Sequence, residues 1–149
     1  MAEPAEQKGW PQRIEYSTAC WRLASRIRRM FGKDRLDECM GLNALFVRSP
    51  SIKRYGQLSE AVRTQIAEFC LPRSMQIAEA IQPRLIVLIG LCTGDLLRVI
   101  ERDPNNPRIL VGSVAGVITI AIPHPSSPFV SNATLDRAAE RIRTLAGWN

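Results

Sequence analysis

Short apolar runs alternate along the chain with segments in which apolar residues recur every three or four positions. A continuous apolar run bounded by glycine, serine or proline is typical of a buried strand, and the helical spacing is typical of a helix that buries one face. This pattern predicts strands over 42–47, 85–89, 109–111 and 117–122. It predicts helices that begin near Ser17 or Thr18, Ser59, Ser74 and Thr93, and a last helix near the C-terminus.

Two of these helices have a well-defined apolar stripe. In the first helix, which Gly32 ends, the stripe is Ala19, Leu23, Ile27 and Met30, and in the last it is Leu135, Ala138, Ala139, Ile142 and Leu145. Pro72 separates the helix over 59–69 from the helix over 74–81. The helix that starts at Thr93 is expected to reach about Arg102, before a turn over 103–108.

Helices that alternate with buried strands predict an α/β fold with a mainly parallel sheet and helices on both faces. The length of 149 residues suits one domain, here 17–149, preceded by an N-terminal arm over 1–16. In such sheets ligands bind beyond the carboxyl ends of the strands. His124, the one histidine of the chain, follows the last predicted strand directly and therefore lies at that edge.

Charge favours a polyanionic partner without proving one. The formal net charge is +6, and basic residues gather in two groups, which are either solvated faces or phosphate contacts. These groups are Arg22, Arg26, Arg28, Arg29 and Lys33, and then Arg48, Lys53 and Arg54. Apolar runs are too short to cross a bilayer and the first ten residues are polar, so a cytoplasmic protein without membrane contact is expected.

The sequence carries no strong signal for a metal or cofactor. Four cysteines, with no C-x-x-C pair and a single histidine, make a zinc site improbable and favour buried, reduced thiols; they are Cys20, Cys39, Cys70 and Cys92. No phosphate-binding glycine motif and no G-x-S-x-G occurs, whereas cysteine–histidine catalysis stays open. We expect neither a metal nor a cofactor.

Two polar residues are candidates for a site. His124 lies between two prolines, which stiffen its loop, and Ser126 and Ser127 add hydroxyl groups beside it. A lone loop histidine is as readily silent as functional. Asn43 lies within the predicted strand over 42–47, where a polar side chain must find partners or face a site.

Three stretches, in order, resemble the uracil-DNA glycosylase superfamily, and above all its iron–sulfur-containing bacterial and archaeal class. Residues 43–50 (NALFVRSP) resemble the N-x-x-K-C-R-P strand and loop, and residues 70–90 resemble the C-x-P…Q-I-x-x-I-x-P-K-x-I-x-x-x-G segment. Residues 124–127 (HPSS) resemble the H-P-[AS] motif that precedes the closing helix. The resemblance implies a three-layer sandwich and a protein of base excision repair, which hydrolyses the N-glycosidic bond of uracil or a related base in single- or double-stranded DNA.

The resemblance also implies roles for single residues. Asn43 would hydrogen-bond the flipped base, and His124 would stabilise the departing uracil anion. Pro125, Ser126 and Ser127 would press on the DNA backbone, because a target base must leave the stack. Arg48 and Lys53 would contact phosphates.

The chain departs from the family in two respects. It has no G-x-x-P-G-type motif before Asn43, so no residue is assigned to activate water, and Glu15, Asp34 and Asp37 are stand-ins without a motif. Without the strand that carries this motif, another segment fills the sheet, the chain is shortened, or a protein partner or self-association completes it. Only Cys70 matches a cluster cysteine, so no iron–sulfur cluster is expected.

Three hypotheses follow. The first is a uracil-DNA glycosylase, and the second is an inactive relative that binds nucleic acid or protein through the same surface. The third is an unrelated α/β domain with chance similarity.

Overall fold

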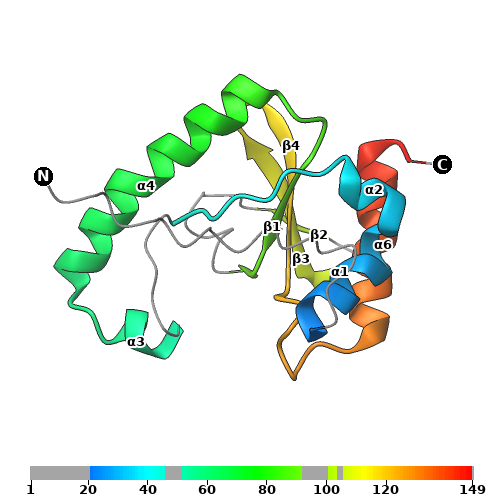
Figure 1. The fold of residues 1–149 in the computed structure, drawn as a ribbon, viewed down its shortest axis with the longest axis horizontal. Helices are drawn as coiled ribbons and strands as arrows, with labels where there is room; N and C mark the ends of the chain where they lie inside the picture. Colours follow the sequence, from blue (N-terminus) through cyan, green and yellow to red (C-terminus); the bar gives the residue numbers. More distant parts are fainter. Residues whose placement is uncertain (1–20, 46–51, 92–100, 104–105, 149) are drawn as a thin grey trace, which may run out of the picture.

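Five helices and one four-stranded sheet make up the described part of the chain, a mixed α/β fold (Figure 1). The computed structural model describes residues 21–45, 52–91, 101–103 and 106–148. The predicted N-terminal arm, Ser17, Thr18 and Thr93 therefore lie outside the described residues. The helices are α1 (Arg22–Phe31), α2 (Lys33–Asp37), α3 (Ile52–Gly56), α4 (Glu60–Ile81) and α6 (Asn132–Ala146). The strands are β1 (Ile86–Ile89), β2 (Glu101–Asp103), β3 (Asn106–Val114) and β4 (Val117–Ile122).

The sheet is mixed, and the prediction of a mainly parallel sheet was wrong. Its order is β1-β4-β3-β2, with β1 and β4 parallel and the other two pairs antiparallel. Ala115 and Gly116 connect β3 to β4 with φ values of 51° and 77°. Two consecutive positive φ angles are typical of the tight turn that joins antiparallel strands. Residues 101–103, the predicted end of a helix, instead pair with β3 as the edge strand β2.

The main core lies between one face of the sheet and the two helices α1 and α6. Ile120 and Ile122 of β4 point to this face and are fully buried. The predicted stripe of α6 is confirmed, because its first four members are at most 2% exposed and Leu145 packs against the same cluster. In α1, Ile27 and Met30 are buried as predicted.

Two terminal features hold α1 against α6. Gly32 ends α1 with a φ of 77°, as predicted, and the chain turns there into α2. The Phe31 and Trp148 rings meet edge to face, with centroids 6.3 Å apart. The last turn of α1 is therefore fixed to the residue that follows the end of α6.

The long helix α4 contrasts with this packing, because only Cys70 among its 22 residues is buried. In Figure 1 it lies on the other side of the sheet from α1 and α6 and runs away from it. A smaller apolar cluster, with Leu88 and Ala121, lies on the second face of the sheet. In the part of the chain that the structure describes, α4 does not cover this second face as a helical layer would.

The prediction of two helices separated by Pro72 was wrong, since α4 continues through the proline. A proline inside a helix removes one backbone donor and pushes the preceding carbonyl groups outward. Here the Arg73 guanidinium donates to the Phe69 carbonyl oxygen at 2.6 Å and lies 3.7 Å from the centre of the Phe69 ring. Arg73 thus supplies a donor to the turn that the proline disturbs.

Three further observations concern single predictions. Residues 42–45 are irregular, with a bend at 44–45, rather than the start of the strand predicted over 42–47, and the rest of that stretch lies outside the described residues. Cys70 is a buried thiol, as predicted, whereas the Cys39 thiol is exposed. No helix in the described ranges combines the length and the apolar character needed to span a membrane.

Candidate functional site

The candidate site is the loop from Pro123 to Ser131, which leaves the end of β4 and enters α6. Gly90 donates its backbone N–H to the Ile122 carbonyl oxygen at 2.8 Å, so the ends of β1 and β4 lie together just before the loop. At the other end of the loop, the Ser131 hydroxyl caps α6 by accepting the Thr134 N–H at 3.2 Å. The loop therefore starts and finishes on fixed elements, at the predicted edge of the sheet.

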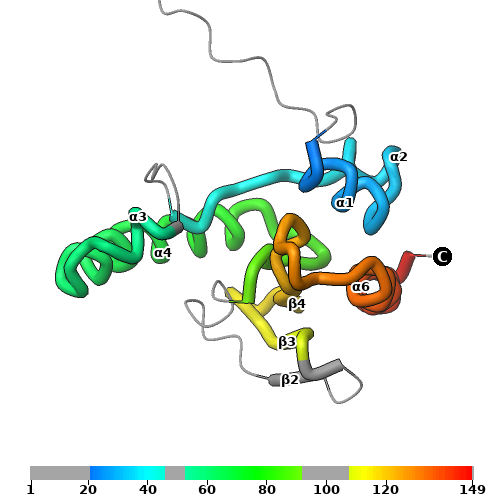
Figure 2. The backbone as a smooth tube through the Cα atoms, turned by 90° about the horizontal axis from the view of Figure 1, so that it is seen from below, coloured from blue at the N-terminus to red at the C-terminus, as the bar shows by residue number. Residues whose placement is uncertain are grey.

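Arg26 of α1 holds this loop, and Figure 2 shows the backbone of α1 next to the segment that leads into α6. Its Nη1 donates to the carbonyl oxygens of Pro125 at 2.6 Å, Val130 at 3.0 Å and Ser127 at 3.4 Å. The Pro125 side chain is fully buried beneath the loop. One guanidinium group and one buried ring thus fix a segment that would otherwise leave its carbonyl groups to water.

His124 is exposed, and its ring has a defined orientation. The Ser126 backbone N–H donates to Nδ1 at 3.3 Å, and the Ser126 Oγ lies 2.8 Å from the same atom. A backbone N–H can only donate, so Nδ1 accepts and the ring proton lies on Nε2. Partial burial lowers the pKa of His124 below its ordinary value of 6.5, which favours the neutral ring at pH 7.

Ser127 completes the polar side of the loop. Its backbone N–H donates to the His124 carbonyl oxygen at 2.9 Å and closes a tight turn. Its hydroxyl oxygen accepts the Phe129 N–H at 3.4 Å, which leaves the hydroxyl proton available to an outside acceptor. The loop therefore presents two donors, the Nε2–H of His124 and the Ser127 hydroxyl.

Among the described residues, no hydrogen bond or ion pair joins Asn43 to this loop. Asn43 is exposed in the segment after α2, and the carbonyl oxygen of its neighbour Ala44 accepts the Ser74 hydroxyl of α4 at 3.1 Å. His124, by contrast, belongs to the loop that Arg26 of α1 holds. The two polar residues that the sequence suggested as a pair thus lie in segments that contact different helices, α4 and α1.

The other predicted residues lie away from the loop or outside the described residues. Lys53 is exposed on α3, which Figures 1 and 2 both show well apart from the loop before α6. Arg48 and Glu15 are outside the described residues. Asp34 and Asp37 are on α2, which lies near the C-terminal end of α6, the end opposite the loop. This placement follows from the contact of Arg35 of α2 with the Trp148 ring, 5.4 Å from its centre. Fifteen helical residues, about 22 Å, separate that end from the loop, so neither carboxylate can activate water beside His124.

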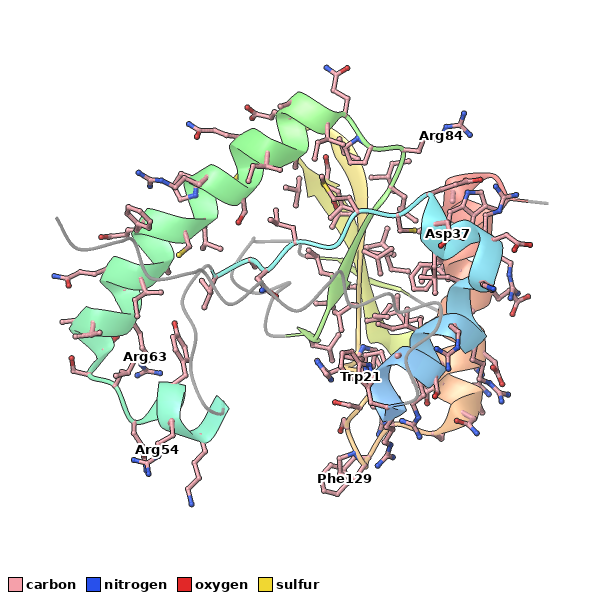
Figure 3. All side chains as sticks on the ribbon, viewed as in Figure 1. Trp21, Asp37, Arg54, Arg63, Arg84 and Phe129 are labelled. Carbon is pink, nitrogen blue, oxygen red and sulfur yellow. The ribbon has the colours of Figure 1, made fainter. Side chains whose placement is uncertain are left out.

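Sequence reasoning missed three residues at this site. Arg26 was noted only as one of a basic group, and nothing in the sequence shows that it binds a loop some 100 residues away. Phe129 and Trp21 are 86% and 45% exposed. Figure 3 places both rings at the end of the molecule where α1 begins and the loop turns. An aromatic residue in a polar, proline-rich loop was the available signal for Phe129.

Comparisons with known proteins add no relative. No protein-family model matches the chain, and no curated protein or solved structure matches it significantly either.

Proposed function

We propose that this chain is a nucleic-acid-binding domain that contacts the DNA backbone through the loop between β4 and α6. The observation that carries the proposal is the fixed loop, in which the Nε2–H of His124 and the proton of the Ser127 hydroxyl remain as donors. Phosphate oxygens only accept hydrogen bonds, and most hydrogen bonds between proteins and DNA go to phosphate and sugar. Donors on a rigid loop therefore suit a phosphate.

Charge around the loop supports the same partner. No aspartate or glutamate occurs between residues 21 and 33 or between residues 104 and 135, the two stretches that include α1 and the loop. The first stretch carries four arginines and a lysine. The carboxylate that follows, Asp136 of α6, is paired with Arg29 of α1, so this surface stays basic. A basic surface attracts a polyanion, and the attraction weakens as salt increases.

A uracil-DNA glycosylase is the second candidate, and one observation favours it. A neutral imidazole with its proton on Nε2 can donate a hydrogen bond to a developing anion and remain neutral. A glycosylase of this superfamily would have a three-layer sandwich fold, in which helices also cover the sheet face with Leu88 and Ala121. Against it stand the segment of Asn43, which contacts α4, and the distance of Asp34 and Asp37 from the loop.

The test is binding of fluorescent oligonucleotides, measured by anisotropy over a range of salt concentrations. We expect binding that weakens with salt. The slope of the logarithm of the binding constant against the logarithm of the salt concentration should be reduced by about one in His124→Ala or Ser127→Ala, because each change removes one phosphate contact. Arg63→Ala is the matched control, since Arg63 is exposed on α4, away from the loop (Figure 3). Absence of salt-dependent binding would overturn the proposal.

The pH dependence separates the two candidates. As the pH falls through the pKa of His124, which burial holds below 6.5, the ring gains a proton and a positive charge. Binding to phosphate should then become tighter, and this gain should be absent in His124→Gln. A glycosylase that uses the neutral ring would lose activity over the same range. Alkali-labile sites in uracil-containing strands, lost in both His124→Ala and Asn43→Ala, would favour the enzyme.

A further inference from the structure

Two aromatic side chains are exposed beside the candidate loop. Phe129, within the loop, is 86% exposed, and Trp21, directly before α1, is 45% exposed. Figure 3 labels both at the same end of the molecule, with Phe129 pointing away from the loop. Single exposed aromatics are ordinary on protein surfaces, so only the surroundings of these two rings can indicate a function for them.

The backbone around Phe129 is fixed although its ring has no packing partner among the described residues. The Ser127 hydroxyl accepts the Phe129 N–H at 3.4 Å, and Arg108 of β3 donates to the Phe129 carbonyl oxygen at the same distance. Arg26 holds the carbonyl group of the next residue, Val130. A ring on a fixed backbone loses little conformational freedom when a ligand covers it.

Comparison with the other strongly exposed phenylalanine shows why this one is distinctive. Phe69 on α4 is 57% exposed, but the Arg73 guanidinium already lies over its face, 3.7 Å from the ring centre. Nothing in the described part of the chain stacks on Phe129. Its face is therefore open to a planar group from outside.

Arginines border the two rings. Arg22 follows Trp21 and is exposed, one helical turn before Arg26 and on the same face of α1. Arg108 lies beside Phe129 through the contact with its carbonyl group. The guanidinium group suits phosphate oxygens and also stacks on planar rings. Aromatic faces between arginines, with no carboxylate in either stretch of sequence, match the alternation of bases and phosphates along a nucleic acid.

From this arrangement we infer that Trp21 and Phe129 form a stacking platform for the bases of single-stranded DNA, with Arg22 and Arg108 on its phosphates. In a duplex the base faces are covered by their neighbours, whereas a single strand offers them to protein rings. The inference rests on the proposed DNA binding and adds to it the form of DNA that the domain prefers. Stacking tolerates any base, so little sequence preference is expected.

The experiment compares three probes of equal length by anisotropy: a single-stranded 8-mer of thymidines, the same strand made of abasic sites, and a duplex. We expect the thymidine strand to bind roughly ten-fold more tightly than the abasic strand, which keeps the phosphates but has no bases to stack. In Phe129→Ala this difference should largely disappear, and the abasic strand should bind as it does to the unchanged protein. Phe69→Ala is the matched control and should leave all three affinities unchanged.

Distinct outcomes identify which idea fails. If none of the probes binds, the proposed function fails and the platform with it. If thymidine and abasic strands bind equally, or if Phe129→Ala leaves their difference intact, the platform is refuted while backbone binding stands. Trp21→Ala should reduce the difference in the same direction. An RNA 8-mer shows whether the sugar matters, and tighter binding of RNA than of DNA would overturn the assignment to DNA. Circular dichroism of each variant verifies the fold.

Discussion

The two longest helices, α6 and α4, belong to one chain but are stabilised in different ways. Five of the 15 residues of α6 are buried, and they form one stripe against the sheet. In α4 one residue of 22 is buried, and large apolar side chains, among them Val62, Phe69 and Ile81, remain more than 40% exposed. The comparison shows that α6 is held by tertiary packing, whereas α4 buries little against the described residues and relies more on its own cap and on contacts within the helix.

The largest expected effect comes from truncating the packed helix. Ile142→Ala removes a fully buried side chain from the core between α6 and the sheet, and should lower the free energy of unfolding by about 2–5 kcal/mol. Phe69→Ala, an exposed position on α4, should change it by about 0.5 kcal/mol or less. Urea denaturation followed by circular dichroism measures both. Equal losses would contradict the contrast between the helices.

The contact between α1 and the loop should come next. Arg26→Ala removes the donor to three carbonyl groups. The free energy of unfolding should fall by about 1.5–3 kcal/mol, because hydrogen bonds to a charged group are stronger than neutral ones. The His124 proton signals in NMR should shift, since the loop loses its support. Arg28→Ala, on the same helix, is the control and should leave those signals in place.

A smaller effect is expected within α4. Arg73→Ala removes the donor to the Phe69 carbonyl group and the cation above the Phe69 ring, next to Pro72. We expect faster amide hydrogen exchange in this part of α4, because the free energy of local opening should fall by about 1 kcal/mol or less. The midpoint of global unfolding should not change. A shifted midpoint would mean that α4 is coupled to the core.

The smallest effect concerns the exposed ion pair between α1 and α6. Arg29 and Asp136 form two hydrogen bonds of 2.8 and 2.9 Å. The hydrogen bond from Arg29 lowers the pKa of Asp136 below its ordinary value of 3.8. The pair therefore contributes stability above pH 3.8, and this contribution is lost as the pH falls toward the lowered pKa. Asp136→Asn should unfold with a weaker dependence on pH between 4 and 2, and high salt should diminish the difference.

What the sequence predicted well follows from the same comparison. The stripe of α6 was predicted correctly, because burial against one surface imposes a regular period. The predictions of a helix break at Pro72 and of a mainly parallel sheet were wrong, because α4 continues through the proline and because Ala115, in a left-handed conformation, helps to turn β3 back into the antiparallel strand β4. Both depend on context that a local pattern does not contain.

The site was predicted in part. The position of His124 after the last strand could be inferred, because the order of the elements places that loop at the edge of the sheet. The partner of the loop could not, since a contact between Arg26 and residues 125–130 spans about 100 positions of sequence. The suggested pairing of Asn43 with His124 assumed that residues 42–47 form a strand, and residues 42–45 do not.

The cations around Trp21 and Phe129 are nearly all arginines, and across the whole chain 17 of the 20 basic residues are arginine. A guanidinium group keeps its proton at any pH that a cell experiences, and it is not a substrate for lysine acetylation. The positive charge of this end of the molecule is therefore close to permanent. Apart from protonation of His124, only occupancy by an anion or methylation of the arginines themselves would modify how it interacts.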